Sequence, residues 1–280
     1  MDTSAPTARA QRWLEVLGDA CTRIGERAER MEPAERASNL GRGAGGDITA
    51  GIDRMAEDEL LVALRRLHHE DGIAMTLLSE ELGVLEIGGG GTPIVIADPI
   101  DGSQNAKRGA PSFATAVAVA DRPTMGGVWL ALVHDHGTGE AFVAERGVGV
   151  WRNGVRLSPP PTPTRLRLLG VEGTSPARLG TALELLSGNV TRVRSIGSLA
   201  LSLVWAALGR TDGLLGLGAA RSVDVAAAQL IATELGCLVG LPTVDELDGT
   251  PLDLATRRRV VASPSPELLG VLISAVGSVG

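Results

Sequence analysis

Apolar residues recur every three or four positions in two stretches of the N-terminal part of the chain. This spacing places them on one face of a helix and predicts helices over residues 6–31 and over Asp53–His69, with Asp53 as the N-cap of the second. Pro33 follows the first stretch and ends it. The intervening segment Asn39–Asp47 is dense in glycine, which predicts a mobile loop.

The pattern changes after residue 73 to short apolar runs that are separated by turn residues. Runs of this length with β-branched residues predict strands. The predicted strands are 75–78, 93–97, 113–120, 127–133, 140–144 and 149–152. Asn153-Gly154 follows the last of them and is a strong signal for a tight hairpin turn.

Strands and helices alternate in the second half of the chain. We expect strands at 165–171, 190–196, 211–217, 237–241 and 259–262, and helices at 176–187, 198–208, 224–235 and 265–276. Such alternation implies layers of helix and sheet. Together with the hairpin-rich first half, we expect an α+β fold. The proline-rich segment Ser158–Pro163 predicts a linker between an N-terminal α+β half (1–160) and a C-terminal α/β half (161–280), or a stiff surface loop within one domain.

The composition narrows the class of protein. The chain has 280 residues, of which 44% are hydrophobic and 21% charged, as in folded globular proteins. It carries 26 basic and 33 acidic residues, and its basic run Arg257–Arg259 is short, which argues against a nucleic-acid partner. Its longest apolar stretches fall short of a membrane span and no secretory signal is evident, so we expect a cytoplasmic protein without a membrane partner. Cys21 and Cys237 fit no metal or redox spacing and are expected to be buried free thiols.

The strongest chemical signal is the segment Asp98-Pro99-Ile100-Asp101-Gly102-Ser103, which follows a buried apolar run. Two carboxylates three residues apart, with the Ile100 carbonyl between them, offer the all-oxygen ligand set that suits Mg²⁺. Gly102 allows close approach to the backbone, and Ser103 can begin a short helix that faces an anion. The alternative interpretation is an acidic surface turn, because these residue types are also common in turns.

Further acidic residues stand where predicted elements begin or end. Glu80 and Glu81 close the predicted strand 75–78, and Asp224 opens an apolar helix. Either glutamate could bridge two cations. Taken alone, Asp53 and Asp224 are better explained as helix N-caps.

Together these segments resemble the inositol monophosphatase family of Mg²⁺- and Li⁺-sensitive phosphatases. The resemblance rests on Glu80-Glu81, the DPIDGS segment and the Asp224 helix, in that order. It extends to the segments Asp47-Ile48-Thr49…Asp53, Gly197-Ser198 and Asp253-Leu254. It implies a layered αβαβα sandwich of the sugar phosphatase type and a homodimer.

The resemblance also implies a role for each matching residue. One Mg²⁺ would be held by Glu80, Asp98 and the Ile100 carbonyl. A second would be held by Asp98, Asp101 and Asp224, and a third ion would share Glu80. The implied catalytic residues are Asp53, Glu80 and Ser103, of which Asp53 and the Ser103 hydroxyl would activate the attacking water. The amides of Gly102 and Ser103 would hold phosphate. The implied substrate contacts are Asp101, Gly197, Ser198, Arg221 and Asp224, with a loop contact from Arg42.

One departure from the family bears on the substrate. Members specific for inositol place a glutamate shortly before the ligand that Asp224 resembles, whereas residues 213–223 contain no carboxylate, and Gly216 or Leu217 stands in that place. The expected reaction is therefore Mg²⁺-dependent hydrolysis of a small sugar or cyclitol phosphate. Arg221 leaves open a second phosphate, as in fructose 1,6-bisphosphate or a 3′-phosphonucleotide.

Two interpretations outside this family also remain open. Gly41–Gly46 matches the G-x-G-x-x-G pattern of NAD(P)-binding oxidoreductases, but no strand is predicted before it. A non-catalytic scaffold could keep the fold without the chemistry.

Overall fold

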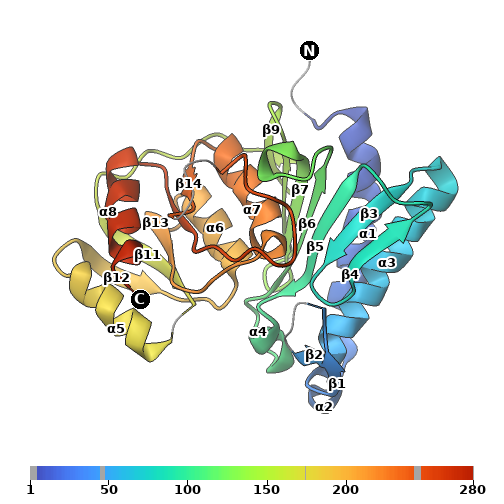
Figure 1. The fold of residues 1–280 in the computed structure, drawn as a ribbon, viewed down its shortest axis with the longest axis horizontal. Helices are drawn as coiled ribbons and strands as arrows, with labels where there is room; N and C mark the ends of the chain where they lie inside the picture. The colour runs from blue at the N-terminus through green and yellow to red at the C-terminus, as the bar shows by residue number, and fades with distance from the viewer. Residues whose placement is uncertain (1–4, 45–47, 174, 243–246, 280) are drawn as a thin grey trace.

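The computed structural model describes residues 5–44, 48–173, 175–242 and 247–279. Its helices and sheets alternate in five layers, which run from right to left in Figure 1. Helices α1 (Ala8–Arg30) and α3 (Gly51–Asp71) form the first layer, and an eight-stranded sheet forms the second. Helices α6 and α7 lie between this sheet and a five-stranded sheet, which α5 and α8 cover on its far side. The predicted layered α+β fold is confirmed.

The eight-stranded sheet has the order β10-β9-β8-β7-β6-β5-β3-β4, and all neighbours are antiparallel except β3 and β5. Its strands are β3 (Met75–Ser79), β4 (Gly83–Ile87), β5 (Ile94–Asp101), β6 (Ala114–Ala120), β7 (Val128–Asp135), β8 (Glu140–Glu145), β9 (Gly149–Arg152) and β10 (Val155–Arg156). A 3₁₀ turn, Met125–Gly127, precedes β7. The predictions for this region omitted β4, an edge strand whose middle residues are largely exposed.

The five-stranded sheet has the order β12-β11-β13-β15-β14. Its strands are β11 (Leu166–Glu172), β12 (Val190–Arg194), β13 (Gly213–Gly216), β14 (Leu238–Gly240) and β15 (Val261–Ser263). The helices beside it are α5 (Pro176–Leu185), α6 (Leu199–Ala207), α7 (Ser222–Glu234) and α8 (Pro266–Gly277). The segment Ser158–Pro163 joins the two sheets and forms neither helix nor strand.

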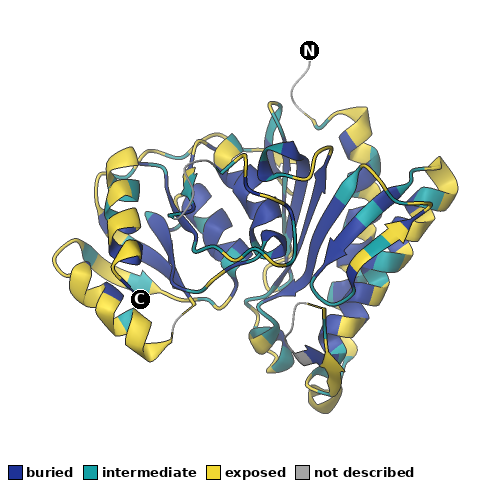
Figure 2. Cartoon of the chain, viewed as in Figure 1, coloured by how far each residue is buried: buried dark blue, intermediate teal, exposed yellow. Residues whose placement is uncertain are grey.

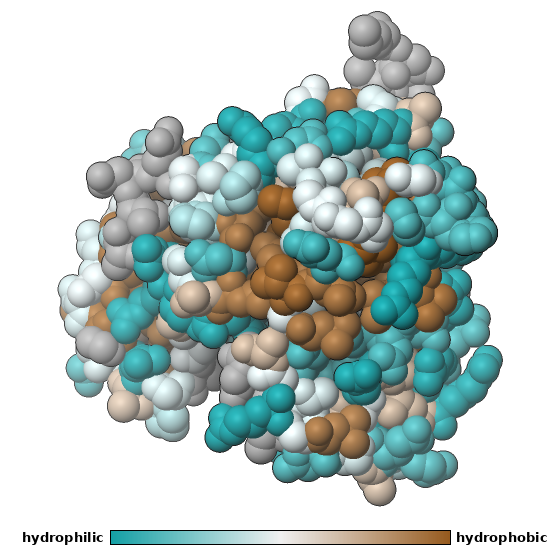
Figure 3. Space-filling view, turned by 45° about the vertical axis from the view of Figure 1, so that its right-hand side comes forward, coloured by the Kyte–Doolittle hydropathy of each residue, from teal (hydrophilic) through white to brown (hydrophobic). Residues whose placement is uncertain are grey.

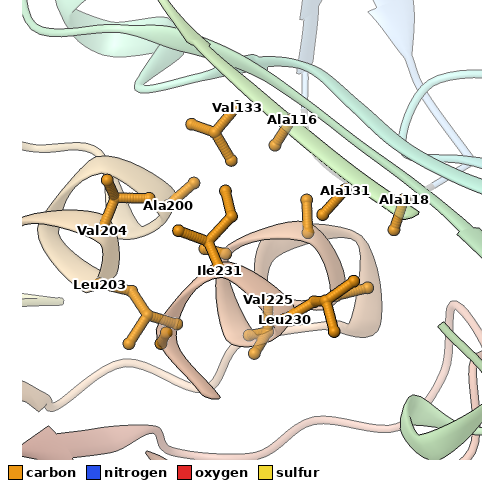
Figure 4. Packing of buried hydrophobic residues seen from close by; sticks show 14 of the residues in the cluster. Ala116, Ala118, Ala131, Val133, Ala200, Leu203, Val204, Val225, Leu230 and Ile231 are labelled. Atoms are coloured by element: carbon orange, nitrogen blue, oxygen red, sulfur yellow. The ribbon is translucent and has the colours of Figure 1, made fainter. Parts of the chain in front are cut away.

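Small side chains bring α7 close to the eight-stranded sheet. All seven residues of β6 are buried, and its alanines face the helices while Val117 and Val119 face the opposite layer. Figure 4 shows Ala116 and Ala118 of β6 and Ala131 of β7 above the helix that carries Ile231 and Leu230. Because alanine leaves room for the larger side chains of α7, the first turn of this helix can reach the end of β5.

Three hydrophobic clusters fill the spaces between the layers. The central strands of both sheets are buried, and the outer helices turn their exposed faces to the outside (Figure 2). On the face shown in Figure 3, apolar residues gather near the middle and hydrophilic residues surround them. Cys21 and Cys237 are buried free thiols, as predicted. In the described part of the chain, no helix is long and apolar enough to cross a membrane.

The segment predicted as a loop between the first two helices is partly ordered. Pro33–Arg36 forms the short helix α2, and β1 (Asn39–Arg42) pairs antiparallel with β2 (Ile48–Ala50). The prediction of a loop is therefore wrong for 39–42, while residues 45–47 lie outside the described part of the chain. The Gly41–Gly46 pattern thus begins in an antiparallel hairpin, which is not the parallel βαβ context that dinucleotide binding requires.

Candidate active site

A β-bulge sets the positions of the two aspartates in the DPIDGS segment. Strand β5 continues through Asp101 instead of ending at Ala97. Its pairing with β6 shifts between Asp98, which lies opposite Ala116, and Asp101, which lies opposite Ala114. Residues three apart point to opposite faces of a regular strand, and the extra residue of a bulge removes this restriction. Both aspartates accordingly line one cavity.

The strand register brings Glu80 to Asp98. Strands β3 and β5 are parallel, and Ser79 lies opposite Ala97, so the next residue of each strand is an acid at the same edge of the sheet. Asp224 enters from the first turn of α7, which packs against β5. Ligand oxygens of Glu80, Asp98 and Asp224 all lie within 4.8 Å of one another. We call these three residues the carboxylate cage.

Arg221 closes the carboxylate cage on one side. Its Nη2 lies 2.5 Å from Oε1 of Glu80 and 3.0 Å from Oδ1 of Asp224. Its backbone N–H donates to Oδ2 of Asp224 at 2.7 Å. Asp224 is therefore the third residue of α7 and Arg221 is the N-cap, so the interpretation of Asp224 as an N-cap is wrong.

Asp101 lies beside the carboxylate cage and is held by the start of α6. Its Oδ2 accepts hydrogen bonds from the Ser198 hydroxyl and, at 2.7 Å, from the Ala200 amide. Its Oδ1 accepts one from the Leu199 amide at 3.2 Å. Ser198 thus contacts Asp101, whereas its neighbour Gly197 lines the cavity directly.

Burial makes these acids hard to ionise. The pKa of Asp98 is raised well above its usual range by burial, and then by the negative charges of Glu80, Asp101 and Asp224. Burial also raises the pKa of Glu80 to about 7, although Arg221 opposes the shift. It raises that of Asp101 to about 7 despite the hydrogen bonds from Ser198 and the α6 amides. The site therefore carries a strong preference for cations or protons.

The cavity beside the carboxylate cage measures about 300 Å³. The cage residues, Asp101 and Arg221 line it, together with the Gly102 and Ser103 pair at the start of the short helix α4 (Ser103–Lys107). Gly102 has a φ of 91°, and an added Cβ would lie 2.9 Å from the Ser112 carbonyl oxygen. Gly216 lines the cavity and Leu217 does not, so of these two positions only Gly216 faces it.

A second cavity of about 420 Å³ shares Glu80, Asp98, Ile100 and Ser103 with the first. It also contains Asp53, Glu81 and Lys107, which is the single lysine of the chain.

Asp53 lies 3.3 Å from the Lys107 ammonium group in this second cavity. It is the third residue of α3, and its Oδ2 accepts the amide of the N-cap residue Ala50 at 2.9 Å, so its prediction as the N-cap is wrong. Burial raises the pKa of Asp53, against this hydrogen bond and the charge of Lys107. Among the described hydrogen bonds none joins Asp53 to Ser103, although both face this cavity.

Two polar residues of the site were missed from the sequence. Glu172, at the end of β11, lines the first cavity and accepts hydrogen bonds from the amides of Ile196 and Gly197 and from the Ser202 hydroxyl. Lys107 was the other. The sequence did offer a signal for each. Glu172 is an acid at the end of a predicted strand, and Lys107 is a solitary lysine one helical turn after Ser103.

One predicted contact lies outside the site. Arg42 is exposed on β1 and is not among the described residues that line either cavity. Asp47 falls outside the described residues.

Comparison with known proteins agrees with this geometry. The sequence model of the inositol monophosphatase family matches residues 9–280. The chain belongs to the inositol monophosphatase family. A protein of Methanothermobacter thermautotrophicus named fructose-1,6-bisphosphatase/inositol-1-monophosphatase is 33% identical over 264 residues, which are 88% of this chain and 91% of that protein. A Vibrio cholerae protein named Nus factor SuhB is 31% identical over 229 residues, which are 76% of each.

Solved structures share the fold of this family member. One described as an inositol monophosphatase–fructose 1,6-bisphosphatase has a TM-score of 0.79 at 26% identity, covering 94% of this chain and 99% of its own. An inositol monophosphatase of Thermotoga maritima has a TM-score of 0.76 at 24% identity, with 95% and 98% covered. The family and these relatives indicate a phosphatase.

Proposed function

We propose that this chain is a Mg²⁺-dependent phosphomonoesterase that hydrolyses a small sugar or cyclitol phosphate. The observation that carries the proposal is the carboxylate cage, in which Glu80, Asp98 and Asp224 bring oxygens within 4.8 Å of one another at the wall of a cavity. A set of ligands that are all oxygen atoms and carry a net negative charge suits Mg²⁺. This ion is usually shared between protein carboxylates and a substrate phosphate. The donor set therefore fits the metal that the family resemblance implies.

Glu80, Asp98 and Asp224 would hold two or three Mg²⁺ ions together with Asp101 and the Ile100 carbonyl. Bound Mg²⁺ lowers the pKa of water and offsets charge on the phosphoryl group and the departing oxygen.

Asp53 is suited to take a proton from the attacking water. Its Oδ2 is occupied by the Ala50 amide and Lys107, whereas its buried Oδ1 has no hydrogen-bond partner among the described residues. Lys107 fixes the orientation of this carboxylate. The Ser103 hydroxyl faces the same cavity and would help to orient the water, and the Gly102 and Ser103 amides would bind phosphate.

Fructose 1,6-bisphosphate is the second candidate substrate. Several relatives are named fructose-1,6-bisphosphatase, among them a Pyrococcus furiosus protein 31% identical over 232 residues. Gly216 offers no carboxylate to a polyol hydroxyl, so discrimination for inositol is expected to be weak.

The test of this function is phosphate release from four compounds: inositol 1-phosphate, fructose 1,6-bisphosphate, a 3′-phosphoadenosine nucleotide and histidinol phosphate. We expect Mg²⁺-dependent release, with one of the first two preferred. Release that continues in excess chelator, or no release from any compound, would contradict the proposed function. A preference for the nucleotide would overturn the substrate class and leave the phosphatase intact.

The family resemblance further leads us to propose a homodimer in the cytoplasm. Light scattering should then give twice the chain mass of 28.9 kDa. A mass of one chain at working concentration would contradict the dimer.

A further inference from the structure

The guanidinium group of Arg221 lies between two members of the carboxylate cage. Its Nη2 approaches Glu80 to 2.5 Å and Asp224 to 3.0 Å, and its Nε lies 3.2 Å from the same oxygen of Asp224. The side chain is only 11% exposed. Two of the three carboxylates that form the candidate metal site are therefore already paired with a cation that belongs to the chain itself.

An arginine and a metal ion cannot use these oxygens in the same way at the same time. Mg²⁺ binds oxygen ligands at about 2.0–2.1 Å in a nearly ideal octahedron. Because Nη2 is close to both Glu80 and Asp224, it occupies space that an ion bound to either carboxylate would need.

We infer that Arg221 is an internal counter-cation that competes with divalent metal for Glu80 and Asp224. This inference rests on the proposed function, since it takes the carboxylate cage to be a metal site. In the metal-free protein, Arg221 offsets part of the repulsion between the buried acids. Metal binding then requires the guanidinium to give up these contacts, which lowers the apparent affinity for the ion.

The position of Arg221 also couples the metal to the substrate. Arg221 lines the 300 Å³ cavity, where an anion is the natural alternative partner for a guanidinium that has left the carboxylates. An anion in this cavity should therefore favour the metal-bound state, and the metal should favour anion binding by the same factor. Metal and phosphate would strengthen each other's binding through this one residue.

The experiment measures Mn²⁺ binding without substrate, from the electron paramagnetic resonance signal of free Mn²⁺. Wild type is compared with Arg221→Gln, and with Arg210→Gln as a matched control. Arg210 forms a 2.7 Å pair with Glu140 and lines neither cavity. We expect Arg221→Gln to bind Mn²⁺ about ten-fold more tightly and the control to match wild type. Added inorganic phosphate should tighten Mn²⁺ binding in wild type much more than in Arg221→Gln.

Equal or weaker Mn²⁺ binding by folded Arg221→Gln would overturn the inference and leave the metal site standing. If wild type binds no Mn²⁺ at all, the proposed function fails as well. Should Arg221→Gln not fold, Arg221→Lys keeps the charge but loses the two-pronged geometry, and it is expected to bind Mn²⁺ with intermediate affinity. Affinity below that of wild type in Arg221→Lys would likewise contradict the competition.

Discussion

Replacing Glu80 by glutamine should change the stability of the protein in opposite directions with and without metal. Glu80 is a buried acid whose pKa is raised to about 7, first by burial and then by nearby acids, against the opposing charge of Arg221. Glutamine has nearly the same shape and no charge. In the folded, metal-free protein, ionising this buried carboxyl group is unfavourable and lowers the free energy of unfolding. The variant Glu80→Gln removes this destabilisation.

The sign and size of this change in stability follow from the difference between the pKa of Glu80 in the folded and in the unfolded state. Between pH 4.5 and about 7 the unfolded chain releases the Glu80 proton while the folded chain retains it, so rising pH lowers the free energy of unfolding. Above pH 7 the decrease in the free energy of unfolding is complete and amounts to about 3 kcal/mol. Metal-free Glu80→Gln should thus be more stable than wild type by up to this amount at pH 8, and by less than about 1 kcal/mol at pH 5.

Thermal unfolding in chelator and in millimolar Mg²⁺, at pH 5 and pH 8, measures the effect. At pH 8 in chelator, Glu80→Gln should melt higher than wild type, on the order of 5 °C. In Mg²⁺ the order should reverse, because wild type gains stability from binding the ion and the variant gains little.

Glu59→Gln is the control for this experiment. Hydrogen bonds from Arg27 and Arg23 lower the pKa of Glu59 in spite of its partial burial. This variant should lose stability at pH 8 whether or not Mg²⁺ is present. Equal destabilisation of Glu80→Gln at both pH values would contradict this prediction, as would Mg²⁺ stabilising the variant as much as wild type.

Three further predictions concern the rest of the site. Asp98→Asn should lower turnover by roughly two to three orders of magnitude while the circular dichroism spectrum stays the same, and near-normal phosphate release would exclude Asp98 as a metal ligand. Lys107→Met removes a charge that lowers the pKa of Asp53, so the acidic limb of the kcat–pH profile should move to higher pH and Lys107→Arg should restore it; an unmoved profile excludes the pairing. Gly102→Ala should lose about 2 kcal/mol or more in denaturant unfolding, because φ is 91° and the added Cβ meets carbonyl oxygens at 2.9 and 3.0 Å. The control Gly188→Ala, with φ of 83° and open space, should lose less, and equal losses would contradict the steric argument.

The sequence was most informative where buried elements end in acidic residues. Mostly apolar residues precede Glu80 and Asp98, so buried strands could be predicted immediately before the two acids, although β5 itself continues through Asp101. Layering could be predicted for the same reason, since alternating apolar patterns require helices to cover sheets. Short exposed elements were harder: β1 has no apolar pattern and β4 leaves Val84 exposed, so pairing with a neighbour defines both.

Contacts between distant segments could not be predicted from the sequence. Asp53 and Asp224 both sit in the first turn of a helix, where a carboxylate that caps and one that faces a cavity have the same local signature. Arg221 and Glu80 are far apart along the chain, and only the packing of α7 against β5 brings them together. Glu172 faces the cavity because β11 lies beside β13.

The most direct test of the carboxylate cage as a metal site is the anomalous diffraction of Mn²⁺ in crystals of the whole chain. We expect a strong peak between Glu80, Asp98 and Asp224, with carboxylate oxygens at metal-ligand distance and Arg221 no longer bridging Glu80 and Asp224. Saturating Mn²⁺ without a peak at this position, or the three carboxylates pointing to different cavities, would contradict this expectation.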